Sequence, residues 1–514
     1  MFVTLLSATL HGLAGRVVRV EVDVATGLPS FTIVGLPDAA LAEARERVRG
    51  AIRNAGFEFP PRRLTVNLAP ADVPKAGAGL DLPIAIGILV ASGQIRVDGR
   101  WAFVGELSLG GEIRRVRGTL PIVAALVRYG ARRIVVAVEA ADEGRLVPEA
   151  DVVPAATLGE AADLLDGRRR RRPVVGPRVD LVAEPAPPAA DVDDDVPDLA
   201  EVRGQLEARR ALEIALAGGH GILLVGPPGA GKTLLARTVP GLLPPLEPEE
   251  AVLATTIESV ASEAPVRSLL RRRPFRAPHH TSSYAAIVGG GPHLSPGEVT
   301  RASEGVLFLD ELAEFGRDVL EALREPLEEG RITISRAGRS ATFPARFLLI
   351  AATNPCPCGW AGTEHPGCTC RPGVPDRYLA RLSGPLRDRI DLWVEMAPVR
   401  PSDLLLGPPP EGSAAVAARI AAARARQIRL RGVLNGRLAG RRLRAACQLD
   451  REARRRVVEL AVLEGASARG TERLLRVART IADLAGSERV EASHVEEAAR
   501  FRGRLPRAEL AKVG

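Results

Sequence analysis

The chain has 514 residues, of which 46% are hydrophobic but only 3% aromatic, and it carries a formal net charge of +8. This length favours roughly three domains. The longest apolar run, Leu82–Ala91, is far shorter than the ~18 residues of a membrane span, and no basic region precedes the apolar N-terminal residues, so neither a membrane partner nor a secretory signal is expected.

The cysteine content favours a cytoplasmic protein. Five cysteines are too few for a disulfide scaffold in a chain of this size, and four of them cluster. The positive charge comes mostly from arginine, which favours an acidic partner such as nucleic acid, although base composition can also produce an arginine-rich chain.

Residues 1–166 alternate strand and helix patterns and are predicted to form a complete α/β domain. Apolar and polar residues alternate in the predicted strands, and Gly56 and Gly130 stand where the two predicted helices end. The expected elements are strands over Val17–Val24, Leu64–Leu68 and Arg133–Val138, and helices over Ala39–Ala55 and Leu120–Tyr129.

This N-terminal domain resembles the proteolytic domain of Lon proteases. The resemblance runs through the stretches Val73–Gly79 and Gly105–Gly111 and the helix that follows. Where Lon proteases carry the nucleophilic serine this chain has Gly79, and where they carry the general-base lysine it has Thr119 or a neighbour. A serine–lysine mechanism needs both groups, so we expect a non-proteolytic domain for partner binding or assembly.

Residues 167–197 are predicted to be a flexible linker. An unbroken arginine run, Arg168–Arg172, is followed by a Pro/Ala stretch and a cluster of aspartates, a composition that buries little apolar surface. The arginine run could contact nucleic acid or be a solvated part of the linker.

The stretch after the apolar run Ile222–Val225 matches the phosphate-loop pattern GxxxxGK[ST] at every required position. Backbone N–H groups of such a loop surround the phosphates of ATP, the lysine reaches the outer phosphates, and the threonine hydroxyl binds Mg²⁺. The predicted ATP-binding residues are Gly226, Pro227, Pro228, Gly229, Ala230, Gly231, Lys232 and Thr233.

Further downstream the chain has the other parts of an ATP-hydrolysing site. The apolar run Val306–Leu309 ends in Asp310, a predicted Mg²⁺ ligand, and Glu311, a predicted general base. The next buried strand ends at Asn354, where a sensor for the γ-phosphate would stand. Arg389 is the predicted arginine finger for a neighbouring subunit, and a surface ion pair is the alternative role expected for Arg387.

In this order the motifs resemble those of AAA+ ATPases. The stretches Pro274–His280, Gly289–Gly291 with Pro296–Glu298, and Ala478–Leu484 resemble the magnesium-chelatase-like AAA+ family of the ComM/YifB type, over essentially the whole chain. The resemblance implies a homo-hexameric ring that moves on DNA with ATP and performs branch migration in the recombination of transforming DNA. The alternatives are the motor subunit of a magnesium-chelatase-like complex and a protein-remodelling ATPase.

Two segments of the predicted ATPase core, residues 198–405, are candidates for a DNA-facing pore. The Gly/Pro-rich insertion Pro274–Glu298 is expected to be a mobile loop, and Arg331–Arg336 alternates like a hairpin strand. Contacts from such loops to single-stranded or branched DNA would be independent of sequence and sensitive to salt. His279–His280 lacks an acidic or cysteine neighbour, so ordered loop contacts are favoured over a metal site.

Four cysteines, Cys356, Cys358, Cys368 and Cys370, form two C-x-C pairs directly after the predicted sensor strand. Four thiolates in one loop can make a tetrahedral structural Zn²⁺ site. The alternative is four reduced cysteines in a plain insertion.

Residues 413–514 are predicted to form the helical lid of the AAA+ module. Helices are expected over Ser413–Arg431, Asp450–Leu463, Ser467–Leu484 and Ser493–Phe501. From Arg419 to Arg456 there are 13 arginines and two acidic residues, a local balance of +11, which favours a polyanion partner or, alternatively, a solvated surface. Arg469 is the predicted second sensor arginine, with Arg473 and Arg476 as alternatives.

Overall fold

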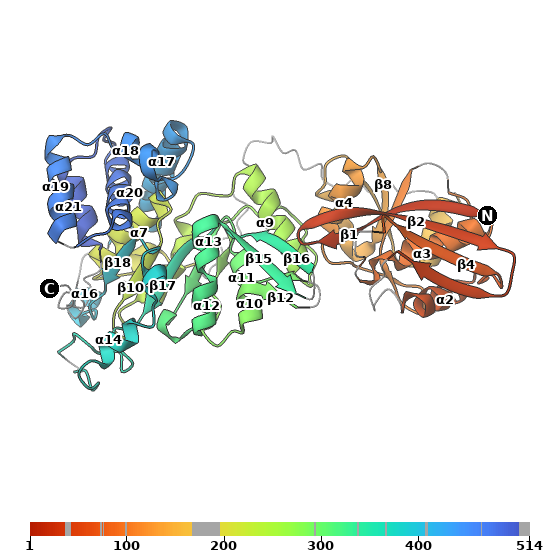
Figure 1. Ribbon diagram of the computed structural model, residues 1–514, viewed down its shortest axis with the longest axis horizontal. Helices are drawn as coiled ribbons and strands as arrows, with labels where there is room; N and C mark the ends of the chain where they lie inside the picture. The colour runs from red at the N-terminus through yellow and green to blue at the C-terminus, as the bar shows by residue number, and fades with distance from the viewer. Residues whose placement is uncertain are drawn as a thin grey trace.

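The computed structural model describes most of the chain, and Figure 1 shows it as an elongated molecule with the N-terminal sheet at one end and the C-terminal helices at the other. The predicted linker lies almost entirely outside the described residues, as do Val73, Pro74 and Ala76 of the Lon-like stretch. The described residues are 1–35, 43–71, 75, 77–97, 100–166, 196–291, 294–336, 339–364, 367–406, 410–463 and 465–502.

The N-terminal part of the described chain is built on a mixed, seven-stranded sheet. The long antiparallel pair in its middle arises because both strands alternate apolar and polar residues and bury one face. A short ribbon of β6 (Glu106–Leu107) and β7 (Ile113–Arg114) lies beside it. In spatial order the strands are β3 (Ser30–Val34), β4 (Arg63–Ala69), β2 (Ala14–Ala25), β1 (Phe2–His11), β5 (Trp101–Val104), β8 (Arg133–Ala137) and β9 (Asp151–Ala155).

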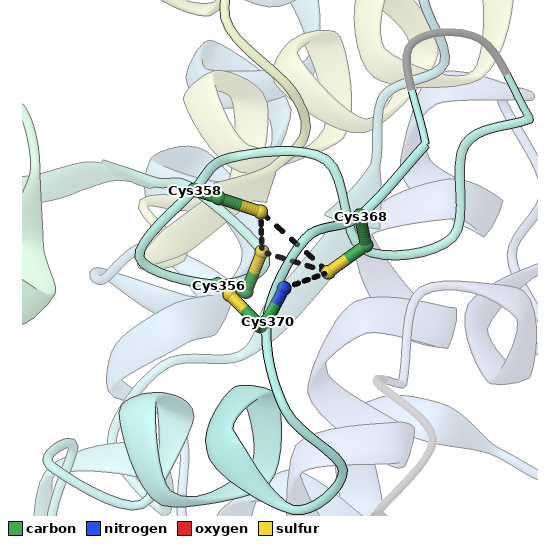
Figure 2. A group of neighbouring side chains, drawn as sticks. All are labelled: Cys356, Cys358, Cys368 and Cys370. Atoms are coloured by element: carbon green, nitrogen blue, oxygen red, sulfur yellow. Dashed lines mark hydrogen bonds between the residues drawn. The ribbon is translucent and has the colours of Figure 1, made fainter.

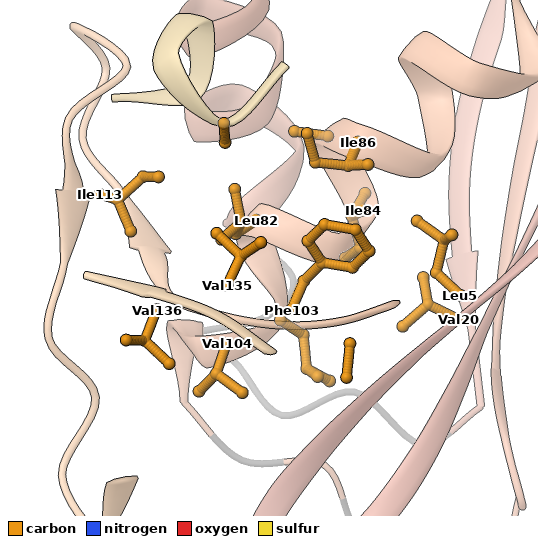
Figure 3. Close-up of a cluster of buried hydrophobic side chains, with 14 of the residues drawn as sticks. Leu5, Val20, Leu82, Ile84, Ile86, Phe103, Val104, Ile113, Val135 and Val136 are labelled. Atoms are coloured by element: carbon orange, nitrogen blue, oxygen red, sulfur yellow. The ribbon is translucent and has the colours of Figure 1, made fainter. Parts of the chain in front are cut away.

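The apolar run Leu82–Ala91 forms most of helix α3 (Asp81–Ala91), which is apolar on all sides because it is buried in this domain. Leu82, Ile84 and Ile86 of this helix lie among Phe103 and the inward side chains of the strands (Figure 3). The other helices of this part are α2 (Ala44–Asn54), α4 (Thr119–Arg128), α5 (Ala141–Arg145) and α6 (Leu158–Leu165).

The strand predictions for this part are confirmed within one to three residues at each end, and so is the helix expected over Leu120–Tyr129. The helix expected over Ala39–Ala55 is confirmed as α2, although residues 39–42 lie outside the described part of the chain.

The two positions that correspond to the Lon dyad lie on either side of Val116. A Cβ atom at Gly79 would lie 3.1 Å from the Val116 methyl groups, and the Thr119 hydroxyl donates a hydrogen bond to the Val116 carbonyl oxygen at 2.8 Å. Gly79 thus faces the Val116 side chain while Thr119 bonds to the Val116 backbone, and neither position offers a nucleophile paired with a lysine. The resemblance of this domain to Lon proteases stays a prediction.

The central part of the described chain is built on a five-stranded sheet in which every neighbouring pair is parallel. A parallel sheet places all strand carboxyl ends at one edge, where ligands bind in α/β folds. In spatial order the strands are β11 (Phe275–Arg276), β14 (Val306–Leu309), β17 (Leu348–Thr353), β10 (Ile222–Val225) and β18 (Leu392–Glu395).

The surrounding segments are helices and two short antiparallel ribbons. The ribbons pair β12 (Gly289–Gly290) with β13 (Ser295–Pro296), and β15 (Arg331–Arg336) with β16 (Arg339–Pro344). The helices are α7 (Leu206–Gly218), α8 (Lys232–Arg237), α9 (Pro248–Ala261), α10 (Tyr284–Val288), α11 (Glu298–Arg301), α12 (Arg317–Ala322), α13 (Arg324–Glu329), α14 (Val374–Leu379), α15 (Gly384–Arg387) and α16 (Pro401–Leu405).

The Gly/Pro-rich insertion Pro274–Glu298 differs from the mobile loop expected, because its described residues fold into short elements. Ile287 and Val288 are buried in the core beside the β15–β16 hairpin, and Arg276 forms an ion pair with Glu298 at 2.5 Å. Apolar residues spaced among the glycines allow this packing. The hairpin expected from Arg331–Arg336 is confirmed as β15.

The C-terminal part of the described chain is helical, as expected. Helix α18 is an addition to the predicted helices, and its local pattern is weak because it buries only Leu443 and Cys447 among many arginines. The helices are α17 (Ser413–Arg431), α18 (Gly440–Cys447), α19 (Arg451–Leu463), α20 (Ala468–Leu484) and α21 (Ala492–Arg500). Across the described residues, no helix is both long and apolar enough to cross a membrane.

The N-terminal domain docks on helix α9 of the central part through a buried carboxylate. Glu143 is fully buried and accepts hydrogen bonds from Arg115 at 3.0 Å and from the Ser259 hydroxyl at 2.5 Å. The Gly118 N–H donates to the Ser259 carbonyl oxygen at 2.9 Å. Because Ser259 belongs to α9 and the other three residues belong to the N-terminal part, the two parts are tied by direct bonds and not by the chain between them alone.

Candidate active site

The phosphate loop connects β10 to α8 at the carboxyl edge of the central sheet. Gly229 and Gly231 have φ angles of 78° and 87°, which glycine adopts without the strain that other residues would meet. The loop therefore turns sharply and places the N-terminus of α8, with its partial positive charge, beside it. This is the strand–loop–helix context that the sequence predicts.

Lys232 is nearly buried at 8% exposure, and its ammonium lies inside the loop. It donates to the carbonyl oxygens of Gly226 at 2.6 Å and Pro227 at 2.9 Å, and to the Asn354 side-chain oxygen at 3.1 Å. Burial lowers the pKa of Lys232, while Asp310 and Glu311 oppose this change. The structure thus brings the predicted sensor asparagine, 122 residues away, onto the predicted phosphate-binding lysine.

The two predicted Mg²⁺ ligands also meet. The Thr233 hydroxyl donates to an Asp310 carboxylate oxygen at 2.7 Å. A hydroxyl and a carboxylate are hard oxygen donors of the kind that Mg²⁺ takes in phosphate sites, so the residues present fit the cation.

Glu311 stands directly after Asp310 in a left-handed backbone conformation, with φ of 54°. It is more exposed than its neighbours, and its carboxylate contacts the His280 ring nitrogen at 2.8 Å. The sequence predicts only ordered loop contacts for His280 because no acidic residue is near it in the chain. The fold supplies Glu311 from 31 positions away, and only the strand order could have indicated this.

The predicted arginine finger lies at the opposite edge of the sheet. Arg389 stands just before β18, beside the amino ends of β10 and β17, and pairs with Glu328 of α13. A four-residue strand is roughly 13 Å long at 3.3 Å per residue, so Arg389 does not reach the phosphate loop of its own chain. Among the described residues its neighbour Arg387 has no ion pair, the role considered for it; its guanidinium lies 5.2 Å from the centre of the Trp393 ring.

Several arginines line a cavity of about 650 Å³ at this amino edge of the sheet. Arg469, an exposed residue in the first turn of α20, lines it together with Arg389 and Arg346. Arg469 therefore lies at the amino edge of the sheet with Arg389, away from Lys232 at the carboxyl edge. A sensor role for Arg469 would belong to the same edge of the sheet as the arginine finger.

The two alternatives to Arg469 hold the finger segment in place. Arg473 donates to the carbonyl oxygens of Arg387 at 3.0 Å and Ile390 at 3.1 Å. Arg476 pairs with Asp391 at 3.0 Å, and hydrogen bonding to the buried His220 and the charge of Arg476 keep the pKa of Asp391 low against the effect of burial. Helix α20 thus fixes the backbone that carries Arg389.

The four clustered cysteines come together beyond the sensor asparagine (Figure 2). Their sulfur atoms all lie within 4.8 Å of one another, the geometry of a group that can hold a metal ion. The N–H groups of Trp360 and Thr369 donate to Cys358 and lower its pKa to about 5, whereas hydrogen bonding among the neighbouring thiols raises the pKa values of Cys368 and Cys370.

Comparisons with known proteins agree with these motifs. A family model described as magnesium chelatase, subunit ChlI, matches residues 198–404. Models described as subunit ChlI of Mg-chelatase and as the C-terminal part of that subunit match residues 20–140 and 410–502.

Full-length relatives are found among bacterial proteins. The chain is 44% identical over 490 residues to the protein YifB of Salmonella typhimurium, covering 94% of each chain. It is 42% identical over 498 residues to the competence protein ComM of Haemophilus influenzae, covering 96% of this chain and 95% of the relative. The 38 kDa magnesium-chelatase subunit of Rhodobacter capsulatus is 28% identical over 169 residues, covering 30% of this chain and 48% of the subunit.

The family models, the near full-length identity and the phosphate-loop fold lead to one conclusion. The chain belongs to the ComM/YifB family of magnesium-chelatase-like proteins and carries an AAA+ ATPase module.

Proposed function

We propose that this protein hydrolyses ATP at the interfaces of a homo-hexameric ring and uses the energy to move DNA. The observation that carries the proposal is the separation of the site into two halves. Lys232 and Glu311 lie at the carboxyl edge of the central sheet, whereas Arg389 lies at its amino edge. Because the two halves lie at opposite edges of one sheet, an ATP site is complete only when a second copy of the chain supplies its arginine.

Within one chain the roles follow from the contacts. Lys232 and the loop N–H groups bind the outer phosphates, and Asn354, which already touches Lys232, reports the presence of the γ-phosphate. Glu311 orients and deprotonates the attacking water. Thr233 and Asp310 would hold Mg²⁺, which neutralises phosphate charge when bound.

The arginine-rich lid supports a DNA partner, but fewer of its arginines are available for DNA contact than the sequence indicates. Several of its arginines are neutralised within the chain: Arg419 pairs with Glu213 and Glu411, and Arg431 pairs with Asp483. Helices α18 and α19 carry six exposed arginines, of which Arg455 pairs with Glu459, and Arg336 is exposed on the β15 strand. Contacts from these groups to phosphates would be independent of DNA sequence. The exposed lid arginines here are Arg441, Arg442, Arg444, Arg451, Arg454 and Arg455.

Branch migration in natural transformation is the task that the ComM resemblance implies, and it supports the choice of substrate. The second candidate is the motor subunit of a chelatase complex, which the family descriptions favour. The similarity to the Rhodobacter chelatase subunit covers less than a third of this chain, whereas the similarity to ComM covers nearly all of it, so we favour the DNA motor.

The experiment measures ATP turnover with no DNA and with single-stranded, duplex and four-way-junction DNA. We expect the DNA forms to stimulate turnover, with branched DNA as the substrate that is unwound. No stimulation and no binding by any of them would exclude the DNA motor and leave the chelatase or protein-remodelling role.

Subunit mixing tests the split site. Arg389→Ala subunits should bind ATP and form rings without turnover, and mixing them with Lys232→Ala subunits should restore part of the activity at interfaces that regain both groups. Arg387→Ala is the matched control, because Arg387 lies two residues away and stacks on Trp393. No recovery in rings shown to be mixed would refute the proposal that Arg389 acts in a neighbouring subunit.

A further inference from the structure

Three sulfur atoms of the cysteine cluster are spaced as in a tetrahedral zinc site, and the fourth, that of Cys370, lies within 4.8 Å of them. Zinc–sulfur bonds of ~2.3 Å in a tetrahedron place the sulfur atoms about 3.8 Å apart. The Cys356–Cys358, Cys358–Cys368 and Cys356–Cys368 sulfur distances are 3.3, 3.5 and 3.8 Å. All five cysteines of the chain are free thiols, and backbone N–H groups of Ala361 and Cys370 donate to two of the sulfurs.

The same cluster stands in direct connection with the phosphate loop. Cys356 is fully buried two residues after Asn354, whose side chain accepts a hydrogen bond from Lys232. Gly359, in the turn between the first two cysteines and the rest of the loop, packs against Pro228: a Cβ atom at position 359 would lie 2.7 Å from the Pro228 ring.

A backbone hydrogen bond also joins the phosphate loop to the strand that precedes the cysteine loop. The Thr353 carbonyl oxygen accepts a hydrogen bond from the Gly226 N–H at 3.2 Å, so the phosphate loop is bonded to the end of β17. Within the described residues from Cys356 to Cys370 there is no helix or strand to hold the loop. Its position against Pro228 therefore depends on the cluster of four sulfurs and a few turn bonds.

We propose that Cys356, Cys358, Cys368 and Cys370 bind one Zn²⁺, and that this metal holds the cysteine loop against the phosphate loop so that nucleotide affinity depends on zinc. The metal joins residues that are 14 positions apart in the chain and fixes the turn that contacts Pro228. Binding at such a site stabilises only the folded loop, so losing the metal frees the loop to move away. The second part of the proposal rests on the ATP site described above; the first does not.

Metal analysis tests the first part. The full chain, purified without chelators, should contain about one zinc per chain, and Cys368→Ser should contain less than about 0.1. The control is Cys447→Ala, which removes the remaining cysteine, buried in the lid with its sulfur 3.7 Å from the Leu475 carbonyl oxygen; it should keep its zinc. Wild-type protein without zinc, or with iron in its place, would overturn the assignment.

Nucleotide binding tests the second part. A fluorescent ATP analogue should bind Cys368→Ser at least about tenfold more weakly than wild type. Gly359→Ala should keep one zinc and also bind nucleotide more weakly, because the added methyl group would push the cysteine loop from Pro228. Unchanged affinity in both variants would overturn the coupling.

Hydrogen exchange distinguishes this result from a failed fold or a failed ATP site. In Cys368→Ser the peptides that cover the cysteine loop should lose protection, while those that cover β10 and α7 keep it. Loss of protection throughout the ATPase core would refute a local clamp. If wild-type protein bound no nucleotide, the proposed function would fail, while the zinc content would still decide the metal site.

Discussion

The docking of the N-terminal domain on the ATPase core can be tested by removing one hydroxyl. Ser259→Ala deletes the donor that lies 2.5 Å from the Glu143 carboxylate, which is fully buried at the contact. Glu143 keeps its bonds from Arg115 and from the Leu120 N–H at 3.1 Å. A hydrogen bond to a charged group contributes about 1.5–3 kcal/mol, so the equilibrium for opening of the contact should rise roughly 10- to 140-fold.

The assay is amide hydrogen exchange of the peptide that contains Gly118. The Gly118 N–H donates across the contact to the Ser259 carbonyl oxygen, so its exchange follows the opening of the two parts. Peptides of β4, inside the N-terminal core, should keep their protection. Thr256→Ala is the matched control, since this half-buried hydroxyl donates to the Val252 carbonyl oxygen of its own helix at 2.7 Å and not to the N-terminal part that the structure describes. Gly118 protection unchanged in Ser259→Ala would refute the claim that the buried carboxylate holds the domains together.

Further predictions concern the ATP site and the DNA contact. Glu311→Gln should bind ATP but release phosphate at least ~100-fold more slowly; near-normal release would remove Glu311 from the role of base. His280→Ala should raise ATP turnover in the absence of DNA, because it frees the Glu311 carboxylate from its contact with His280. Unchanged ATP turnover without DNA would show that this contact does not restrain Glu311. Arg476→Ala should lower turnover without weakening ATP binding, because Asp391 beside the finger segment keeps its bond to His220 but loses its ion pair with Arg476; equal loss of ATP binding would contradict this. DNA affinity of Glu311→Gln with ATP should fall steeply with salt, and a flat salt titration would exclude a phosphate contact.

Local patterns in the sequence were sufficient for the central strands and for the phosphate loop. A four-residue apolar run directly before a functional segment predicts a buried parallel strand with that segment at its carboxyl edge. The structure has both cases, Ile222–Val225 before the phosphate loop and Val306–Leu309 before Asp310. The bounds of helix α17 agree with the prediction to the residue, and the glycine that follows it, Gly432, adopts the left-handed conformation that commonly ends helices. Helix α18 was missed because its apolar positions are sparse.

The sequence by itself determined the chemistry that the chain can offer: an amine, a hydroxyl and two carboxylates in phosphate-site order, four thiols in one loop, and an excess of arginine in the lid. These follow from short spacings, which are visible in one dimension. The domain boundaries, the resemblance of the N-terminal domain to Lon proteases and the catalytic roles of the site residues stay predictions.

The tertiary structure alone decided which of these groups meet. Strand order placed His280 against Glu311 and moved Arg389 and Arg469 to the edge away from Lys232. Packing neutralised Arg419 and Arg431, which the sequence counted as free charge. The physical reason is that contacts between residues tens to hundreds of positions apart depend on the register and order of a whole sheet, and no local pattern encodes that order.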